Sequence, residues 1–432
     1  MATLKAVRGT RDLLPPETAL WNRIEATARA VFARYNFGEI RTPIFEDTSL
    51  FARSVGEETD IVSKEMYTWE DRARAQSEKA QSLTLRPENT AGVVRAYIEH
   101  KLGETGQLQK LYYIGPQFRR ERPQKGRYRQ FWQIGAEVIG PPSAGGESPL
   151  RDAEVLEMLA TLLNELGITG WTLELNSVGS SADRARYNEV LRATLAGVAP
   201  RMCADCQRRA VTNPLRVLDC KVAEDQPIID ALPKITDSLD EESKKHFAAV
   251  TAALDAAGVP YTRNPRLVRG LDYYTRTTFE FTHGGLGAQN ALLGGGRYDG
   301  LSEAIGGPKA PGIGFAMGLD RLVLTLQATE SVQNSASPQV AKADGYIAPL
   351  GENVNAAALV LARELRRAGL SIELGDGSFR LKKSFEAADK TARRIVILGE
   401  DELQSGILTV KDFATGIQTK VPRAELAELL SQ

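Results

Sequence analysis

The spacing of apolar and polar positions predicts a helix near the start of the chain and a strand after it. Apolar residues recur at helical spacing over residues 20–35, so this segment is expected to form an amphipathic helix. Residues 39–46 predict a strand with an internal proline, which indicates a sheet edge or a bulge. Residues 71–82 are mostly polar and predict a solvated loop, and a helix is predicted over residues 91–102.

Two strands are predicted at residues 111–119 and 129–139, on either side of a basic loop. Side chains on a strand alternate between its two faces. One face of the second strand is apolar and is expected to pack in a core. Its other face carries Phe131, Gln133, Gly135, Glu137 and Ile139.

The first strand carries Gly115, Gln117 and Arg119 on one face. A glycine removes a side chain from the surface of a strand. The two strands are therefore predicted to offer polar groups and an aromatic ring around an open floor. The alternative is a solvent-exposed sheet face, but an exposed strand gains nothing from glycine.

A further strand with one bare face is predicted over residues 312–317. Gly312, Gly314, Ala316 and Gly318 share that face. Such a face suits a flat ligand or a closely packed backbone. The chain has no GxGxxG fingerprint at this strand and no GxxxxGK[ST] phosphate loop, so a nucleotide would bind in another way.

The order of the predicted elements divides the chain into segments. A helix over residues 151–166 and a strand over residues 171–177 precede a mostly helical stretch that suggests an insertion. Strand patterns return over residues 267–281, and a polar linker later leads into alternating strands and helices. The predicted segments are 1–179 and 265–327 for the main domain, 180–264 for the insertion, 328–344 for the linker and 345–432 for a small α/β domain.

Composition excludes several classes of protein. Lysine and arginine number 54 and aspartate and glutamate 55, so a net charge of -1 excludes a uniformly basic nucleic-acid-binding protein. No run of about 18 apolar residues occurs, and the first residues lack the apolar segment of a signal peptide. Three cysteines among 432 residues cannot form a disulfide framework. The expected location is the cytoplasm, without a membrane partner.

The segment from Arg119 to Arg129 contains six basic residues and one acidic residue, the densest positive charge in the chain. Arginine binds phosphate through two parallel hydrogen bonds, so a phosphate group is the natural partner of this loop. The alternative is a solvated charged loop without a ligand.

Metal binding is not predicted. The three histidines lie far apart in the sequence, which excludes an HExxH zinc site. Cys203, Cys206 and Cys220 form a CxxC motif followed by a third cysteine, but no histidine lies nearby to act as a fourth ligand. Structural zinc prefers four protein ligands.

Several motifs together resemble one family. EIRTPIFE is similar to motif 1 of the class II aminoacyl-tRNA synthetases, YYIGPQFRRERPQKGRYRQFWQIGAEVIG to motif 2 and APGIGFAMGLDRL to motif 3. VRGLDYYTRTTFEF and LRPENTAG resemble the histidine signature and the substrate loop of the bacterial histidyl-tRNA synthetases. The resemblance extends from Val7 through the C-terminal domain.

The resemblance implies an α+β fold, in which helices flank an antiparallel sheet that carries a helical insertion and a C-terminal α/β anticodon-binding domain. It implies a homodimer formed through motif 1. The implied reaction joins histidine and ATP, with Mg²⁺, to give histidyl-adenylate, and then transfers histidine to the 3′ end of its cognate tRNA.

The resemblance also implies a histidine site. Its members are Glu88, Asn89, Thr90, Gln133, Glu137, Tyr273 and Tyr274. Glu88 and Thr90 of the substrate loop, with Gln133, would hold the α-ammonium group. Glu137 and Tyr274 would bracket the imidazole, with Tyr273 beside them.

For ATP, the resemblance implies that Arg119 contacts the α-phosphate and the substrate carboxylate. Phe131 would stack on the adenine, and Arg321 would bind the γ-phosphate. Arg269 would stabilise charge at the α-phosphate, so Arg119 and Arg269 are the implied catalytic residues.

In the basic loop, Arg122 and Gln124 would contact the acceptor end of the tRNA. The chain departs from the family pattern at Asn89, where glycine is usual, and at Asp320, where glutamate is usual. Two alternatives remain, a non-catalytic paralogue that regulates histidine biosynthesis and a related synthetase for another amino acid. The histidine signature and the C-terminal domain disfavour the paralogue, and the signature residues RGLDYY disfavour a synthetase for another amino acid.

Overall fold

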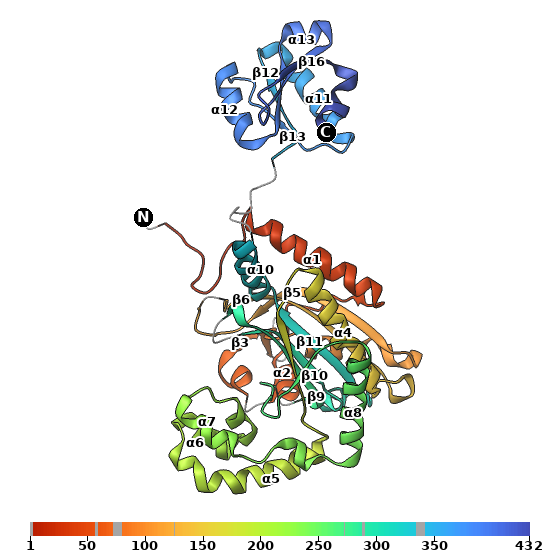
Figure 1. Ribbon diagram of the computed structural model, residues 1–432, viewed down its shortest axis with the longest axis vertical. Helices are drawn as coiled ribbons and strands as arrows, with labels where there is room; N and C mark the ends of the chain where they lie inside the picture. Colours follow the sequence, from red (N-terminus) through yellow and green to blue (C-terminus); the bar gives the residue numbers. More distant parts are fainter. Residues whose placement is uncertain are drawn as a thin grey trace. The chain divides into compact units, whose positions relative to one another are not determined.

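The computed structural model describes residues 3–56, 59–71, 80–124, 126–271, 273–286, 290–333 and 342–432. The chain divides into two compact units, Met1–Ser337 and Pro338–Gln432 (Figure 1). Each unit has its own sheet and its own hydrophobic core. Within the described residues, no helix is both long enough and apolar enough to cross a membrane.

The first unit is built on an eight-stranded sheet in the order β1-β5-β6-β11-β10-β9-β7-β8. Neighbouring strands are antiparallel except at the two edges, where β1 pairs with β5 and β7 with β8 in parallel. This sheet confirms the predicted fold class. The strands are β1 (Gly38–Glu39), β5 (Gln109–Phe118), β6 (Gln130–Ile139), β7 (Trp171–Ser177), β8 (Thr262–Arg263), β9 (Thr275–His283), β10 (Ala291–Arg297) and β11 (Gly312–Gly318).

Four helices and the sheet share the largest core of this unit. In the first helix the buried residues are spaced three or four positions apart, so a single apolar stripe faces the core, as the sequence predicts. The apolar side chains of β6, from Trp132 to Val138, pack in the same core and confirm the predicted face. The helices are α1 (Glu17–Arg34), α4 (Pro149–Glu165), α8 (Glu241–Ala256) and α10 (Leu319–Gln333).

Smaller elements complete this unit around a second, three-stranded sheet in the order β2-β4-β3. The strand predicted over residues 39–46 is wrong, because only its ends are extended as strands, in β1 and β2, and Pro43 lies between them. The additional elements are β2 (Phe45–Asp47), β3 (Tyr67–Asp71), β4 (Gln81–Leu85), α2 (Thr48–Val55), α3 (Thr90–Glu99) and α9 (Leu301–Ala304).

The insertion has a separate hydrophobic core, formed between Val178 and Ile235. Its main helices are α5 (Ser181–Val198), α6 (Ala204–Thr212) and α7 (Gln226–Asp230). The predicted end at residue 264 is too late, because α8 packs in the core of the main sheet and β8 pairs with β7.

Three further predictions need correction or lie outside the structure. In the stretch 267–281 only β9 is a strand, and β10 was not predicted. The predicted linker begins too early, because its first residues, 328–333, continue α10. Residues 72–79 of the predicted loop and 334–341 of the linker lie outside the described residues.

The second unit has a five-stranded sheet in the order β13-β12-β14-β15-β16. Strands β13, β12 and β14 are parallel to one another, as predicted. Strand β15 pairs antiparallel with β14, and β16 pairs antiparallel with β15. Its elements are β12 (Gly345–Pro349), α11 (Asn355–Arg367), β13 (Ile372–Leu374), α12 (Leu381–Thr391), β14 (Arg394–Leu398), α13 (Glu400–Ser405), β15 (Ile407–Asp412), β16 (Gln418–Pro422) and α14 (Leu426–Ser431).

Candidate active site

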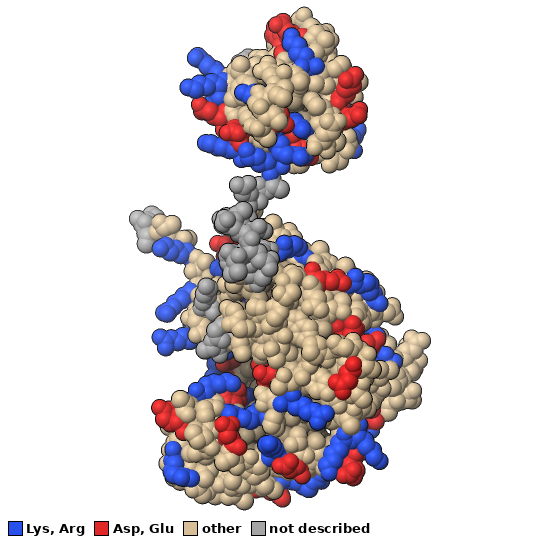
Figure 2. Space-filling view, in the orientation of Figure 1, with Lys and Arg blue, Asp and Glu red and all other residues tan. Residues whose placement is uncertain are grey.

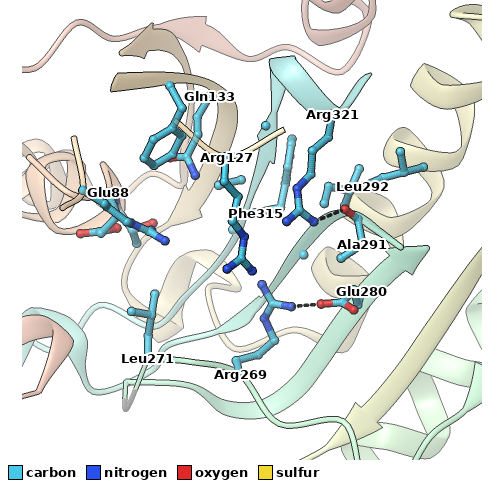
Figure 3. A pocket seen from close by; sticks show the side chains of 18 of the residues that line it. Glu88, Arg127, Gln133, Arg269, Leu271, Glu280, Ala291, Leu292, Phe315 and Arg321 are labelled. Atoms are coloured by element: carbon cyan, nitrogen blue, oxygen red, sulfur yellow. Dashed lines mark hydrogen bonds and ion pairs between the residues drawn. The ribbon is translucent and has the colours of Figure 1, made fainter. Parts of the chain in front are cut away.

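A pocket lies over the centre of the eight-stranded sheet, at strands β6, β11, β10 and β9 (Figure 3). It encloses about 1100 Å³ of empty space, part of which is open to solvent. Nine of the predicted site residues line it. They are Glu88, Thr90, Arg119, Phe131, Gln133, Arg269, Tyr273, Tyr274 and Arg321.

The glycines of these strands make room for side chains of neighbouring elements. A Cβ atom on Gly314 would lie 1.6 Å from Oε2 of Glu137, and one on Gly135 would lie 2.3 Å from the hydroxyl of Tyr113. A Cβ on Gly312 would lie 2.5 Å from the ring of Tyr298. The bare faces predicted from the sequence are thus largely filled by the protein itself, which locks polar groups against the sheet.

Glu137 is fully buried behind the pocket wall. The hydroxyl of Thr90 donates to Oε1 over 2.8 Å, and the hydroxyl of Tyr298 donates to Oε2 over 2.7 Å. Within the described part of the chain, no basic side chain forms an ion pair with this carboxylate. Burial raises the pKa of Glu137 to about 8, although both hydroxyl donors oppose the shift. The two hydroxyl donors, one to each oxygen, are therefore the partners that the described residues give this carboxyl group.

Glu88 is positioned by the first turn of α3. Its carboxylate accepts hydrogen bonds from the backbone N–H groups of Thr90, over 2.7 Å, and Ala91, over 3.0 Å. A helix N-terminus favours such an anion. Burial raises the pKa of Glu88 despite these bonds. Nearby, Oε1 of Gln133 is buried and has no partner among the described residues, so it is an acceptor available to a ligand.

Three tyrosines form the aromatic side of this end of the pocket. The ring centroids of Tyr273 and Tyr274 lie 4.7 Å apart, and those of Tyr273 and Tyr298 lie 6.0 Å apart. Burial raises the pKa of all three hydroxyl groups, so they remain neutral donors at physiological pH. Hydroxyls and carboxylates beside aromatic rings suit a small polar ring.

Arginines occupy the other end of the pocket. Figure 3 shows the guanidinium groups of Arg127, Arg269 and Arg321 turned toward the same space. Arg269 contacts Oε2 of Glu280 at 2.5 Å, and Arg321 donates to the backbone carbonyl of Ala291 over 2.6 Å. These contacts fix the cations in place, so the site is prepared for an anion such as a phosphate chain.

Arg119 joins the two ends of the pocket. Its Nε donates to the carbonyl of Pro87 over 2.9 Å, and its guanidinium lies 5.3 Å from the ring centroid of Phe131. Phe131 in turn lines the pocket together with Gly318, where a Cβ would meet nothing closer than 3.9 Å. The space beside this glycine admits a planar group.

Besides Glu137, three predicted residues do not line the pocket. Asn89 is buried next to it, and its side chain accepts a 2.5 Å hydrogen bond from Thr42. Arg122 and Gln124 are exposed in the basic loop, where the backbone groups of Gln124 and Arg127 exchange two hydrogen bonds. Lys125 of this loop is outside the described residues.

Asp320 has a defined contact with Arg11, at 2.9 Å. Because Arg11 also lies 4.8 Å from the ring of Tyr128, this ion pair ties the N-terminal segment to the basic loop and to α10. Asp320, which stands where the family usually has glutamate, therefore has an ion-pair partner within the chain.

The sequence analysis missed four residues that bear on the site, Glu121, Arg127, Glu280 and Tyr298. Arg127 belongs to the basic loop, whose positive charge had already indicated a phosphate partner. Glu280 is the one carboxylate between two core phenylalanines of β9, which strand alternation indicates. Tyr298 follows the unpredicted β10, so no pattern in the sequence linked it to Glu137.

An antiparallel sheet with this pocket, entered by the loop between β5 and β6 and closed by the glycine strand β11, defines the catalytic domain of a class II aminoacyl-tRNA synthetase. The family model described as "Histidyl-tRNA synthetase" matches residues 9–322, and the one described as "Anticodon binding domain" matches residues 344–432. The chain belongs to the histidyl-tRNA synthetase family.

Similar proteins cover nearly all of the chain. A histidine--tRNA ligase of Koribacter versatilis (strain Ellin345) is 72% identical over 98% of this chain and 95% of the relative. One of Solibacter usitatus (strain Ellin6076) is 56% identical over 99% of both chains. Among solved structures, the apo histidyl-tRNA synthetase of S. aureus is 38% identical and covers 100% of both chains with a TM-score of 0.79.

Proposed function

We propose that this chain activates histidine with ATP and transfers it to the 3′ end of its cognate tRNA. The observation that carries the proposal is the division of one pocket into two chemical halves. One half holds the buried Glu137 with its hydroxyl partners, and the other holds the converging arginines. Activation needs both halves, because it joins an amino acid to a nucleotide phosphate.

In the histidine half, we assign the imidazole to Glu137 and Tyr274, with Tyr273 beside them. A neutral imidazole has one donor and one acceptor, which match a carboxylate and a hydroxyl. Glu88, Thr90 and Gln133 would hold the α-ammonium group. The buried, unpartnered Oε1 of Gln133 supports this assignment, because an ammonium donor would satisfy it.

In the phosphate half, the arginines fit the triphosphate of ATP. Arg119 and Arg269 would contact the α-phosphate as the histidine carboxylate attacks it and pyrophosphate leaves, and Arg321 would bind the γ-phosphate. Fixed cations at that point stabilise the transition state more than the ground state. Phe131 would stack on the adenine. Magnesium would enter with ATP, and its carboxylate ligands would come from the acidic side chains that line this half, Glu121 and Glu280.

The test is pyrophosphate exchange across the twenty amino acids. Exchange should depend on histidine, and Arg269→Ala should lower its rate by roughly 100-fold or more, the scale for loss of one charge-stabilising donor. Arg192→Ala is the control, because Arg192 is an exposed arginine on α5, outside the pocket. A folded Arg269→Ala variant with the exchange rate of the control would contradict the proposed role.

We further propose that tRNA contacts both units. Arg122 and Gln124 would meet the acceptor end, and the second unit would bind the anticodon. Figure 2 shows basic side chains on the second unit where α12 lies, and exposed members of this group are Arg380, Lys382, Lys383 and Lys390. A phosphate backbone is the natural partner of such a surface.

Charge reversal tests the anticodon contact. The double variant Lys382→Glu and Lys383→Glu should weaken tRNA charging at low tRNA concentration by at least about 10-fold, and it should leave pyrophosphate exchange unchanged. Lys420→Glu, on β16 of the same unit, is the matched control. Equal charging by both variants would remove α12 from the tRNA-binding surface.

We also propose a cytoplasmic homodimer. Motif 1 leaves apolar side chains exposed, with Ile44 at 45% and Phe45 at 52%, and Trp69 packs beside Phe45. Light scattering should give twice the chain mass of 47.1 kDa. The paralogue that only regulates histidine biosynthesis is less supported, because the anticodon-domain match covers the whole second unit.

A further inference from the structure

Three cysteines and one aspartate come together in the insertion. Cys203 caps the N-terminus of α6, and Cys206 lies in the first turn of that helix. Cys220 follows the short helix η5 (Pro214–Asp219), and Asp225 immediately precedes α7. Three Sγ atoms and one carboxylate oxygen all lie within 4.8 Å of one another. No metal was predicted from the sequence because only histidine was sought as a fourth ligand, but the fold supplies a carboxylate.

The separations suit a tetrahedral ion. The Sγ atoms of Cys203 and Cys220 are 3.9 Å apart, and Sγ of Cys220 is 3.3 Å from Oδ2 of Asp225. Zinc–sulfur bonds of about 2.3 Å place two tetrahedral sulfur ligands roughly 3.8 Å apart. Four protein ligands would close the coordination sphere, which is typical of a structural site.

Backbone N–H groups hold these ligands in position. The amide of Cys206 donates to Sγ of Cys203, and the amide of Val222 donates to Sγ of Cys220, both over 3.4 Å. The amide of Cys203 donates to both carboxylate oxygens of Asp225, over 3.0 and 3.2 Å. Such hydrogen bonds orient metal ligands and favour their ionised forms. They also offset the negative charge that three thiolates and a carboxylate leave around a divalent ion.

The burial of the cluster also calls for a cation. Asp225 is only 1% exposed, and within the described residues it forms no ion pair. Buried carboxylates are usually paired with a cation or bound to a metal. Cys206 and Cys220 are buried as well, at 0% and 5% exposure. Their thiolate sulfurs favour zinc over magnesium or calcium.

We propose that Cys203, Cys206, Cys220 and Asp225 form a structural zinc site. Zinc replaces the three thiol protons, which pass to solvent, and joins the start of α6, the end of η5 and the start of α7. The insertion has a small core of its own, and cores of this size commonly need a metal or a disulfide for stability. The ion would therefore hold the insertion in its folded form.

Metal content is the first test. Full-length protein without an affinity tag is purified under reducing conditions from zinc-supplemented cells and dialysed against metal-free buffer. Elemental analysis should find about one zinc per chain, as for a closed four-ligand site. Cobalt added to the metal-free protein should give a thiolate-to-cobalt charge-transfer band, which reports sulfur ligation independently of activity.

Two variants identify the ligands, with a neighbouring control. Cys206→Ser should abolish the cobalt band and the retained zinc, and Asp225→Asn should weaken zinc binding by roughly 10- to 100-fold in competition with a coloured chelator. Glu224→Gln removes an exposed carboxylate beside Asp225 and should bind zinc as the parent chain does. If Cys206→Ser does not fold, Asp225→Asn with its control decides the question.

Three outcomes would overturn the proposal. The first is a parent chain without zinc or a cobalt band, whose three thiols all react freely in the folded state. The second is a Cys203–Cys220 disulfide that persists under reducing conditions. The third is an Asp225→Asn variant that holds zinc as tightly as Glu224→Gln, which would remove the aspartate from the ligand set.

Discussion

Glu137 beside the pocket and Asp152 in the first turn of α4 are both fully buried carboxylates of the first unit, yet their partners differ. Asp152 contacts Nη1 of the equally buried Arg297 at 2.5 Å and accepts a 2.6 Å hydrogen bond from the hydroxyl of Thr277. Glu137 has hydroxyl partners alone. A buried carboxylate with a guanidinium partner is complete within the chain, whereas one with only hydroxyls has capacity left for a substrate.

The largest expected effect is on stability, when the ion pair of Asp152 and Arg297 is broken. Arg297→Met leaves Asp152 buried without its cation, so we expect a loss of about 3–5 kcal/mol in the free energy of unfolding, measured by chemical denaturation. The double variant Arg297→Met and Asp152→Leu removes both charges and should recover most of this loss. Equal destabilisation of the single and double variants would contradict the interpretation of the pair as complete.

The next effect concerns substrate binding at the incomplete site. Glu137→Gln keeps the shape but removes the charge, so the KM for histidine should rise roughly 10- to 100-fold, the range for a hydrogen bond to a charged group. The KM for ATP should change little. Steady-state exchange kinetics with each substrate varied in turn measure both values. An unchanged KM for histidine together with a raised KM for ATP would contradict the assignment of Glu137 to histidine binding.

The pH dependence of stability reports the burial of Glu137. Burial raises the pKa of Glu137 from its ordinary 4.5 to about 8. Between these values the native state binds more protons than the unfolded state, so this group's contribution to stability falls as the pH rises, by up to about 1.4 kcal/mol per pH unit. The Glu137→Gln variant has no titratable group at this position and does not lose stability in this way. In the absence of histidine, the Tm of Glu137→Gln minus the Tm of the parent chain should therefore increase from pH 5 to pH 8. A difference in Tm that stays constant over this range would contradict the raised pKa of Glu137.

The smallest effects come from single hydroxyl groups. Tyr298→Phe removes one donor from Glu137, and Thr277→Val removes one from Asp152. Each should cost about 1 kcal/mol of stability. Only Tyr298→Phe should also raise the KM for histidine, by about 5-fold, because we assign Glu137, and not Asp152, to substrate binding. A similar change of the histidine KM in both variants would contradict the proposed difference between Glu137 and Asp152.

Strand alternation predicted part of the site correctly. It placed Phe131, Gln133 and Glu137 on one face of β6, because successive side chains of any strand point to opposite faces. It could not connect Glu137 with Tyr298, which lies 161 positions away along the chain. That contact depends on how β6, β11 and β10 pair, and register across strands is a property of the folded sheet.

Other differences have the same origin. The mostly helical pattern over residues 180–264 includes α8, but it could not show whether the apolar side chains of this helix face the insertion or the main core. The three cysteines were visible as a motif, yet Asp225 resembles any other acidic residue until α6 and α7 fold against each other. The sequence therefore predicted elements and single faces well, and it predicted contacts between distant elements poorly.

The close approach of Gly314 to Glu137 has a consequence for engineering. Any side chain at position 314 would collide with the carboxylate, since even a Cβ atom would lie 1.6 Å from Oε2. A designer who replaces Glu137 with a smaller residue, to admit a larger histidine analogue, removes this collision, but a Cβ at position 314 would still lie 2.8 Å from the backbone carbonyl oxygen of Ala136. A library aimed at new amino acids should therefore vary position 137 and keep Gly314.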